Sequence, residues 1–155
     1  MKAIIIYAST HHGNTKKVVD AIAKDYDVET VDATAVTEKD LSKYDLIGFA
    51  SGIYAGRFHQ AIQKFAKNNL PVNKKIFFLS TSAMNKDFSA SMKDALKEKD
   101  AQILGYFSCF GYNTFGPFKL IGGTSKGHPN EEDIKNALTF YRNLSDTCSR
   151  FQDII

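Results

Sequence analysis

The feature that most constrains the fold of this chain is the regular alternation of short apolar runs with segments of helical periodicity. Residues 3–8 form a continuous apolar run that contains three isoleucines, which is typical of a strand covered on both faces. Similar short runs recur along the chain, with segments between them whose apolar residues repeat every three or four positions. The expected strands cover residues 3–8, 28–31, 46–50, 76–79 and 103–110.

The segments between these strands are long enough to cross to a parallel neighbour as helices. Apolar spacing predicts helices that include residues 18–22, 61–66 and 88–96, and a weaker one at 37–43 with Thr37 as its cap. The last helix has the clearest pattern, because Asn130 can cap it, acidic residues fill its first turn, and Tyr141 lies within its apolar face. The sequence therefore predicts an α/β fold with an open parallel sheet, in a single domain over residues 1–155.

Composition excludes several classes of protein. The 155 residues suffice for one core, and 20 Lys and Arg against 17 Asp and Glu leave a formal charge of +3 that looks interleaved along the chain. We therefore expect no nucleic-acid partner, and no apolar run approaches the length of an integral membrane segment. Cys109 and Cys148 form no CxxC pair, which favours a reducing, cytoplasmic setting, and Cys109 is expected to be a buried, inert thiol.

Glycines gather in the connections that follow the predicted strands. Eight of the ten glycines lie in such connections, which all fall at the carboxyl edge of a parallel sheet, where open α/β folds bind ligands. The connection at 111–129 is unusually long and carries Tyr112, Phe115 and Phe118. Long connections in compact domains are usually functional or disordered, and these aromatic residues argue against disorder.

The connection after the first strand, residues 9–15, indicates a phosphate site. It offers hydroxyl groups and leads into a helix, whose first backbone N–H groups lack partners within the helix. The Walker A motif GxxxxGK(S/T) is absent, because Asn14 and not lysine follows Gly13. The GxGxxG motif of dinucleotide-binding sites is absent as well. The acids of a receiver domain and the nucleophile of a cysteine phosphatase are also missing. A site that holds a phosphate monoester through neutral donors remains.

These connections resemble the flavin-binding loops of the flavodoxin family. Residues 9–15, S-T-H-H-G-N-T, are similar to the family's phosphate loop, T/S-x-T-G-x-T, and residues 52–57, G-I-Y-A-G-R, to its second flavin loop. Residues 111–119 and 126–129 resemble the late connection of a short-chain subgroup. The resemblance covers essentially the whole chain. It implies a flavodoxin-like three-layer sandwich, a five-stranded parallel sheet of order 2-1-3-4-5, and FMN as the cofactor.

The resemblance also implies which residues hold the flavin. The phosphate would be bound by the first loop, a tyrosine would stack on the ring, and the turn Ser80-Thr81-Ser82 would reach the ring edge or the ribityl chain. The expected FMN-binding residues are Ser9, Thr10, His11, His12, Gly13, Asn14, Thr15, Ser51, Gly52, Ile53, Tyr54, Ala55, Gly56, Thr81, Ser82, Gly111 and Tyr112.

Some roles stay open at the level of sequence. His11 and His12 replace the small residues of the family loop, and they could be partners of the phosphate or exposed loop residues. Tyr112 and Phe115 could stack on the flavin or pack the late connection onto the domain. The spacing of His59 and His128 favours no metal site.

The resemblance implies a one-electron carrier that passes electrons between redox enzymes, with a reductase and an acceptor as partner proteins. The alternative is an FMN-dependent oxidoreductase of the same fold, similar to the menaquinone-dependent protoporphyrinogen oxidases or the quinone reductases. A binding module that keeps the scaffold without flavin is a third possibility. Flavodoxins are usually strongly acidic, so the charge of +3 departs from the family and leaves partner and potential open.

Overall fold

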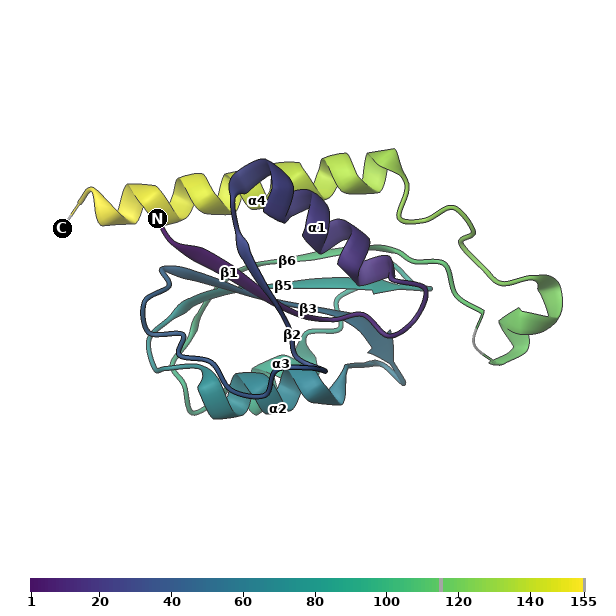
Figure 1. Cartoon of the computed structure of the whole chain (residues 1–155), viewed down its shortest axis with the longest axis horizontal. Helices are drawn as coiled ribbons and strands as arrows, with labels where there is room; N and C mark the ends of the chain where they lie inside the picture. The colour runs from purple at the N-terminus through teal and green to yellow at the C-terminus, as the bar shows by residue number, and fades with distance from the viewer. Residues whose placement is uncertain (115, 155) are drawn as a thin grey trace.

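The computed structural model describes residues 1–114 and 116–154, which form a parallel β-sheet with helices on both faces (Figure 1). The order of the parallel strands is β2-β1-β3-β5-β6, and the additional strand β4 pairs only with β3. The strands are β1 (Ala3–Ala8), β2 (Glu29–Asp32), β3 (Leu46–Tyr54), β4 (Arg57–Phe58), β5 (Lys75–Ser82) and β6 (Gln102–Phe110). The predicted five-stranded sheet of order 2-1-3-4-5 is thereby confirmed, with β5 and β6 as its fourth and fifth strands.

Two layers of helices sandwich the sheet. The helices α1 (Asn14–Tyr26) and α4 (Glu131–Gln152) cover one face, and α2 (Gln60–Asn69) and α3 (Ala90–Ala95) cover the other (Figure 1). Because successive side chains of a strand point to opposite faces, neighbours on one strand enter different cores. Ile4 packs with Phe49 and Phe78 toward α2 and α3, whereas Ile5 packs with Phe77 toward α1 and α4. Burial on both faces explains why these strands are apolar throughout.

The capped end of α4 is as the sequence predicts. Asn130 accepts the N–H of Asp133, and the Asp133 side chain accepts the N–H of Asn130, which together form a capping box. Ala137 and Tyr141 of this helix are buried against the sheet. No helix in the described parts of the chain combines the length and the apolar character needed to cross a membrane.

The third strand extends further than predicted. Its apolar run ends at Ala50, where the sequence predicts a loop, but β3 runs on to Tyr54 and pairs there with Arg57 of β4 in an antiparallel hairpin. Ala55 and Gly56 form the turn, with φ angles of 50° and 76°. The small and polar residues between Ser51 and Tyr54 lack the apolar pattern that reveals a strand, so periodicity did not show this extension.

The predicted helix at 37–43 does not form. The backbone there bonds to a side chain instead, because Asn69 accepts the N–H of Lys39 and donates to the carbonyl of Thr37. Leu41 and Tyr44 are buried in the core on the α2 face. Tertiary packing therefore overrides a weak helical pattern.

Two further predictions need correction at the carboxyl edge. The helix expected over 88–96 is limited to the short α3, Ala90–Ala95. Residues 80–82, expected to form a turn, are the last residues of β5. Ser80 is buried and bonds to the Tyr106 hydroxyl at 2.5 Å, so this serine supports the edge of the sheet and does not line the cavity described below.

The late loop, residues 111–129, projects past the carboxyl ends of the strands (Figure 1). It contains a 3₁₀ helix, η1 (Gly116–Ile121), and an isolated antiparallel bridge between Asn113 and Thr124. The long connection that the sequence predicts therefore contains some secondary structure of its own. Phe115 and the side chain of Phe118 lie outside the described residues.

Candidate functional site

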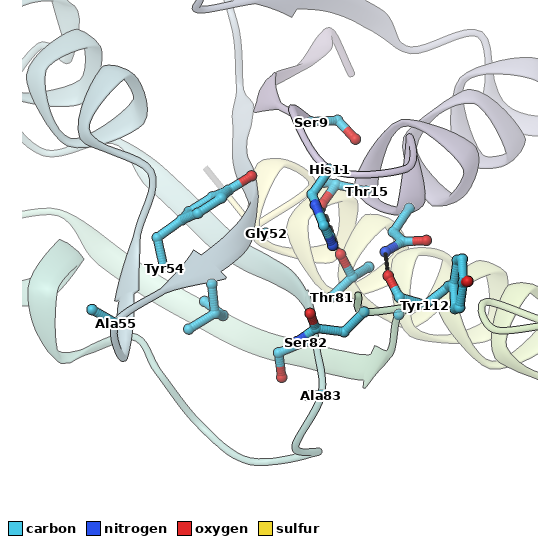
Figure 2. A pocket seen from close by; sticks show the side chains of 14 residues that line it. Ser9, His11, Thr15, Gly52, Tyr54, Ala55, Thr81, Ser82, Ala83 and Tyr112 are labelled. Atoms are coloured by element: carbon cyan, nitrogen blue, oxygen red, sulfur yellow. Dashed lines mark hydrogen bonds between the residues drawn. The ribbon is translucent and has the colours of Figure 1, made fainter. Parts of the chain in front are cut away.

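A cavity of about 360 Å³ lies at the carboxyl edge of the sheet. Side chains from the first loop and α1 face the end of β5 across it, with Tyr54 on one side and Tyr112 on the other (Figure 2). Its walls come from four separate segments of the chain. The lining residues are Ser9, His11, Asn14, Thr15, Gly52, Ile53, Tyr54, Ala55, Thr81, Ser82, Ala83, Gly111, Tyr112 and Asn113.

The first wall is the loop that leads into α1. Gly13 is the N-cap residue, with a φ of 65°, and it has no side chain to accept the helix's first N–H groups. Ser9 compensates in part, because its Oγ accepts the N–H of Lys16 at 3.1 Å. The helix therefore points a poorly capped, electropositive end at the cavity.

Thr15 joins this wall to the end of β5. Its Oγ1 lies 2.8 Å from Oγ1 of Thr81, and both side chains are buried (Figure 2). Beside them, the Ser82 hydroxyl donates to the carbonyl of Met84 and accepts its N–H, which fixes the turn that carries Ala83. The floor of the cavity is thus lined by hydroxyl groups from the start of α1 and the end of β5.

The β3–β4 hairpin forms the second wall. The Tyr54 hydroxyl bonds to Thr10 Oγ1 at 2.7 Å, so its ring spans from the hairpin to the first loop. The ring also meets the imidazole of His59 edge-on, with 5.1 Å between centroids. Gly52 leaves room for this arrangement, because a Cβ there would lie 3.1 Å from the Tyr54 hydroxyl oxygen. Tyr54 therefore presents an aromatic surface that is fixed on two sides.

The late loop closes the cavity and is fastened to the first loop by side chains. Asn14 Nδ2 donates to the carbonyl of Tyr112 at 2.8 Å, and His12 Nε2 bonds to Thr114 Oγ1 at 2.8 Å. The N–H of Thr114 donates to Nε2 of His11 at 3.3 Å. We call these contacts of Asn14, His12 and His11 the latch. They show that both histidines shape the site by holding the late loop.

Tyr112 packs the late loop upon itself. Its ring lies 4.5 Å from that of His12, and its hydroxyl donates to the carbonyl of Gly122 at 3.0 Å. A Cβ on Gly123, whose φ is 93°, would lie 2.5 Å from the same ring. Tyr112 therefore lines the cavity while its ring is engaged in loop packing. Phe115, the other aromatic residue weighed for these roles, lies outside the described residues.

The protonation of His11 follows from its surroundings. Burial lowers the pKa of His11 below its usual value, and the adjacent His12 lowers it further. A neutral imidazole agrees with the geometry, because Nε2 can accept the N–H of Thr114 only when it carries no proton. At neutral pH His11 therefore acts in the latch as an uncharged acceptor.

Most of the predicted site residues meet at the cavity, and five do not line it. Thr10 bonds to the lining residue Tyr54, and His12 bonds to Thr114 of the late loop. Gly13 is the N-cap residue of α1. Ser51 is fully buried, where its Oγ accepts the N–H of His59, and Gly56 lies in the hairpin turn. Conversely, Ala83 and Asn113 line the cavity but were not predicted. Ala83 directly follows the predicted residues Thr81 and Ser82, and Asn113 directly follows Gly111 and Tyr112, so each predicted segment is one residue too short.

The cysteines and histidines show no separate reactive site. Cys109 is buried as predicted, and burial raises the pKa of its thiol to about 12, with a further contribution from Asp133. Cys148 is also buried, and both cysteines are free. Within residues 1–114 and 116–154 no group of three or more His, Cys, Asp or Glu side chains is placed to hold a metal ion.

Comparison with known proteins relates this fold and site to one family. A family model described as a flavodoxin domain matches residues 4–114, and thus all of the cavity lining. An uncharacterized protein of Methanocaldococcus jannaschii is 44% identical over 147 residues, which are 93% of this chain and 98% of the relative. The late loop beyond Thr114 lies outside the match to the family model.

Solved structures agree on the fold. The oxidised Flavodoxin 2 of Bacillus cereus superposes with a TM-score of 0.67 at 17% identity, covering 95% of this chain and 99% of the other. A flavoprotein of Lactobacillus acidophilus, solved in complex with FMN, gives a TM-score of 0.50 at 19% identity over 69% of this chain and 92% of its own. With the cavity at the same carboxyl edge that the sequence motifs mark, this chain belongs to the flavodoxin family.

Proposed function

We propose that this chain binds FMN in the cavity at the carboxyl edge and acts as a one-electron carrier between redox proteins. The observation that carries the proposal is the convergence of a poorly capped helix end, buried hydroxyl groups and a fixed tyrosine on one cavity. The helix end can bind a phosphate, the hydroxyl groups can bond to a polyol chain, and the tyrosine can stack on a flat aromatic ring. Membership of the flavodoxin family supports the same cofactor.

The residues present fit such a group in size and in chemistry. A volume of about 360 Å³ lies within the roughly 300–1,000 Å³ of ordinary ligand pockets. No acidic side chain lines the cavity, so no carboxylate there repels a phosphate. The first wall offers backbone N–H groups at the start of α1 together with the hydroxyl of Ser9 and the amide of Asn14. Anions are stabilised at such helix ends.

When bound, FMN supplies the chemistry, because its ring can take up and release one or two electrons. The protein's own residues would do the rest. Those at the start of α1 bind the phosphate, Tyr54 shields one side of the cavity from water, and the latch keeps the late loop across the other. The free thiols suit a reducing compartment, and we place the carrier in the cytoplasm.

Reductive titration tests the carrier function. The purified chain is loaded with FMN, freed of excess cofactor and reduced stepwise with dithionite while the visible spectrum is recorded. A carrier is expected to show two resolved one-electron steps. A single two-electron step, together with turnover of a quinone or a porphyrinogen, would replace the carrier by the FMN-dependent oxidoreductase. Failure to bind FMN at all would contradict both functions.

The variant Thr15→Val tests where the phosphate binds. Loss of a hydrogen bond to a charged group costs about 1.5–3 kcal/mol, so the dissociation constant for FMN should rise roughly 10- to 100-fold. Thr15→Ser keeps the hydroxyl and should retain the affinity. Thr147→Val is the matched control, because the Thr147 hydroxyl is exposed on α4 and bonds only to its own helix, at Asn143. Equal affinity of Thr15→Val and the wild type would remove Thr15 from the phosphate site.

A further inference from the structure

The segments that build the cavity contain no acidic residue. Residues 1–19, 46–86 and 101–130 together carry 11 lysines and arginines and no aspartate or glutamate. Every residue that lines the cavity belongs to one of these three segments. All 17 acidic residues lie in the remaining parts of the chain, so the segments that build the cavity are basic although the charge looks interleaved along the whole sequence.

Four exposed cationic side chains lie on the segments that line the cavity or continue from them. Arg57 pairs with the cavity residue Tyr54 across the hairpin, and Lys86 lies in the loop that begins at Ala83. Lys119 and Lys126 belong to the late loop. All four side chains are exposed, and none forms a salt bridge with any described residue. We call Arg57, Lys86, Lys119 and Lys126 the cationic rim.

The late-loop members of the rim are tied to the cavity wall. The Tyr112 hydroxyl donates to the carbonyl of Gly122, and the N–H of Gly122 donates to the backbone carbonyl of Lys119 at 3.4 Å. Thr124, two residues before Lys126, forms the antiparallel bridge with Asn113. The backbone that carries Lys119 and Lys126 is therefore joined to the cavity residues Tyr112 and Asn113.

The acidic residues closest to the rim in sequence are engaged in local structure. The Asp87 side chain accepts the N–H of Ser89 at 2.7 Å. Asp133 bonds to His128 at 2.6 Å and completes the capping box of α4, whose first turn also carries Glu131 and Glu132. These carboxylates lie at the starts of α3 and α4, outside the lining of the cavity.

Apolar side chains are exposed next to the cationic rim. The exposed fractions of Leu120 and Ile121 on η1 are 89% and 75%, and that of Met84 in the loop after β5 is 56%. Apolar contacts within a polar, charged border are the usual composition of a protein–protein interface. The apolar residues and the rim thus lie on the same segments, which continue from the residues that line the cavity.

We propose that this face docks an acidic redox protein, whose carboxylates meet Arg57, Lys86, Lys119 and Lys126 while its apolar centre covers Leu120, Ile121 and Met84. The proposal rests on the proposed function and specifies its partner. Here the flavodoxin-like chain is basic and its partner acidic, whereas flavodoxins are usually acidic and their partners basic. Docking by opposite charges chiefly raises the association rate, which then falls as salt is added.

Several observations favour a protein over an anionic membrane. The four cations lie on three separate structural segments, whereas membrane-surface binding usually relies on one long amphipathic helix. The only helical segment that carries exposed apolar residues at this face, within the described chain, is the six-residue η1. A partner with a shaped, acidic surface satisfies this arrangement better than a flat lipid layer.

Two acceptors of opposite charge test the proposal. Native cytochrome c is basic, and exhaustive succinylation of its lysines makes the same haem protein acidic. In a stopped-flow experiment the ferric haem of each takes one electron from FMN-loaded protein that dithionite has reduced, becoming ferrous. For the succinylated form we expect the rate constant at low ionic strength to be on the order of tenfold higher than at high ionic strength. For native cytochrome c the rate constant should instead rise as salt is added. The opposite salt dependence of the two acceptors would overturn the proposal.

Charge reversal identifies the surface. The variant Arg57→Glu/Lys119→Glu/Lys126→Glu should abolish the preference for the succinylated acceptor. The control Lys24→Glu/Lys97→Glu/Lys99→Glu changes the net charge equally, but its residues lie near the amino edge of the sheet, at the end of α1 and before β6. This control should keep the preference. Equal loss of the preference in both variants would mean that net charge, not this face, steers the acceptor.

A measurement without flavin separates this proposal from the proposed function. Hexacyanochromate(III), an anionic paramagnetic probe, should broaden amide NMR signals at residues 55–57 and 119–126 more than the tris(ethylenediamine)chromium(III) cation does. The reverse would overturn the proposal even if FMN binds well.

Cosedimentation with phosphatidylserine vesicles tests the membrane alternative. If the wild type cosediments and the variant Arg57→Glu/Lys119→Glu/Lys126→Glu does not, the face binds membranes and the docking of a protein is overturned. If FMN fails to bind while the anion gathers at the rim, only the proposed function fails.

Discussion

The strands β1, β3 and β5 and the late loop, residues 111–129, meet at the same cavity but are held in place by different interactions. The central strands bury their side chains on both faces, with Phe77 and Phe78 fully enclosed. The late loop depends on the latch and on the packing of Tyr112, and it exposes Leu120 and Ile121. Burial of apolar area contributes much more to stability than a few hydrogen bonds at the surface.

This difference separates the location of the site from its closure. The strands determine where the cavity lies, because their carboxyl ends carry the first loop, the hairpin and Thr81. The late loop determines how far the cavity is closed, and its few contacts can break without unfolding the sheet. Segments of low local stability are those that proteins use for binding and release.

Substitution of one large side chain in each region should give the largest contrast. Phe78→Ala removes a fully buried ring and should lower the free energy of unfolding by about 3–5 kcal/mol. Leu120→Ala should change it by less than about 0.5 kcal/mol, because the Leu120 side chain is almost fully exposed. Chemical denaturation followed by circular dichroism measures both. Similar losses in the two variants would contradict the division into a core and a weakly held loop.

Glycine substitutions test the same division through clashes. A Cβ on Gly48 would lie 2.3 Å from Cζ of Phe77 in the closed core, so Gly48→Ala should cost about 1–3 kcal/mol of global stability. Gly123→Ala meets the Tyr112 ring and should free the late loop, raising amide exchange there while the unfolding midpoint stays nearly constant. Gly122→Ala is the control, because its φ is also positive but its Cβ meets no atom within 4 Å. A large global loss in Gly123→Ala would show that the loop is part of the cooperative core.

The smallest expected effect is a response of the latch to pH. Because the pKa of His11 is lowered in the folded chain, this histidine is neutral when docked and binds a proton more readily when released. The contribution of His11 to docking is therefore fully present above its ordinary pKa and declines as the pH falls through the lowered value. Amide exchange at Thr114, corrected for its intrinsic pH dependence, should accelerate as the pH is lowered. In His11→Gln this dependence should be weaker, and an unchanged dependence would exclude His11 as its source.

The sequence predicts the parts of the structure that burial dictates. The apolar runs at residues 3–8 and 76–79 identified two central strands, and parallel topology then brought their loops to one edge. The end of β3 was not predicted, because Gly52 and Tyr54 line the cavity and are only partly buried, so they do not continue the apolar pattern of the strand. The absent helix at 37–43 depends on Asn69, a contact that no local pattern reveals.

The latch and the acid-free segments illustrate a second limit. His11 and His12 stood out in the sequence, but their role depends on Thr114, about a hundred residues away along the chain. The absence of acids from three segments is visible in the sequence, yet it acquires meaning only when folding brings these segments around one cavity. Contacts between distant segments therefore defined the finer features of the site.

The most direct test of the central claim is a titration of the ¹⁵N-labelled chain with FMN, followed by NMR. We expect saturable binding, with the largest shifts at amides of residues 9–15, 52–56, 81–83 and 111–114, and smaller ones in the buried amides of β1 and β3. No shifts at millimolar FMN, or shifts confined to the lysine-rich groove between α2 and α3 around Lys64 and Lys97, would contradict the assignment of the cavity as the flavin site.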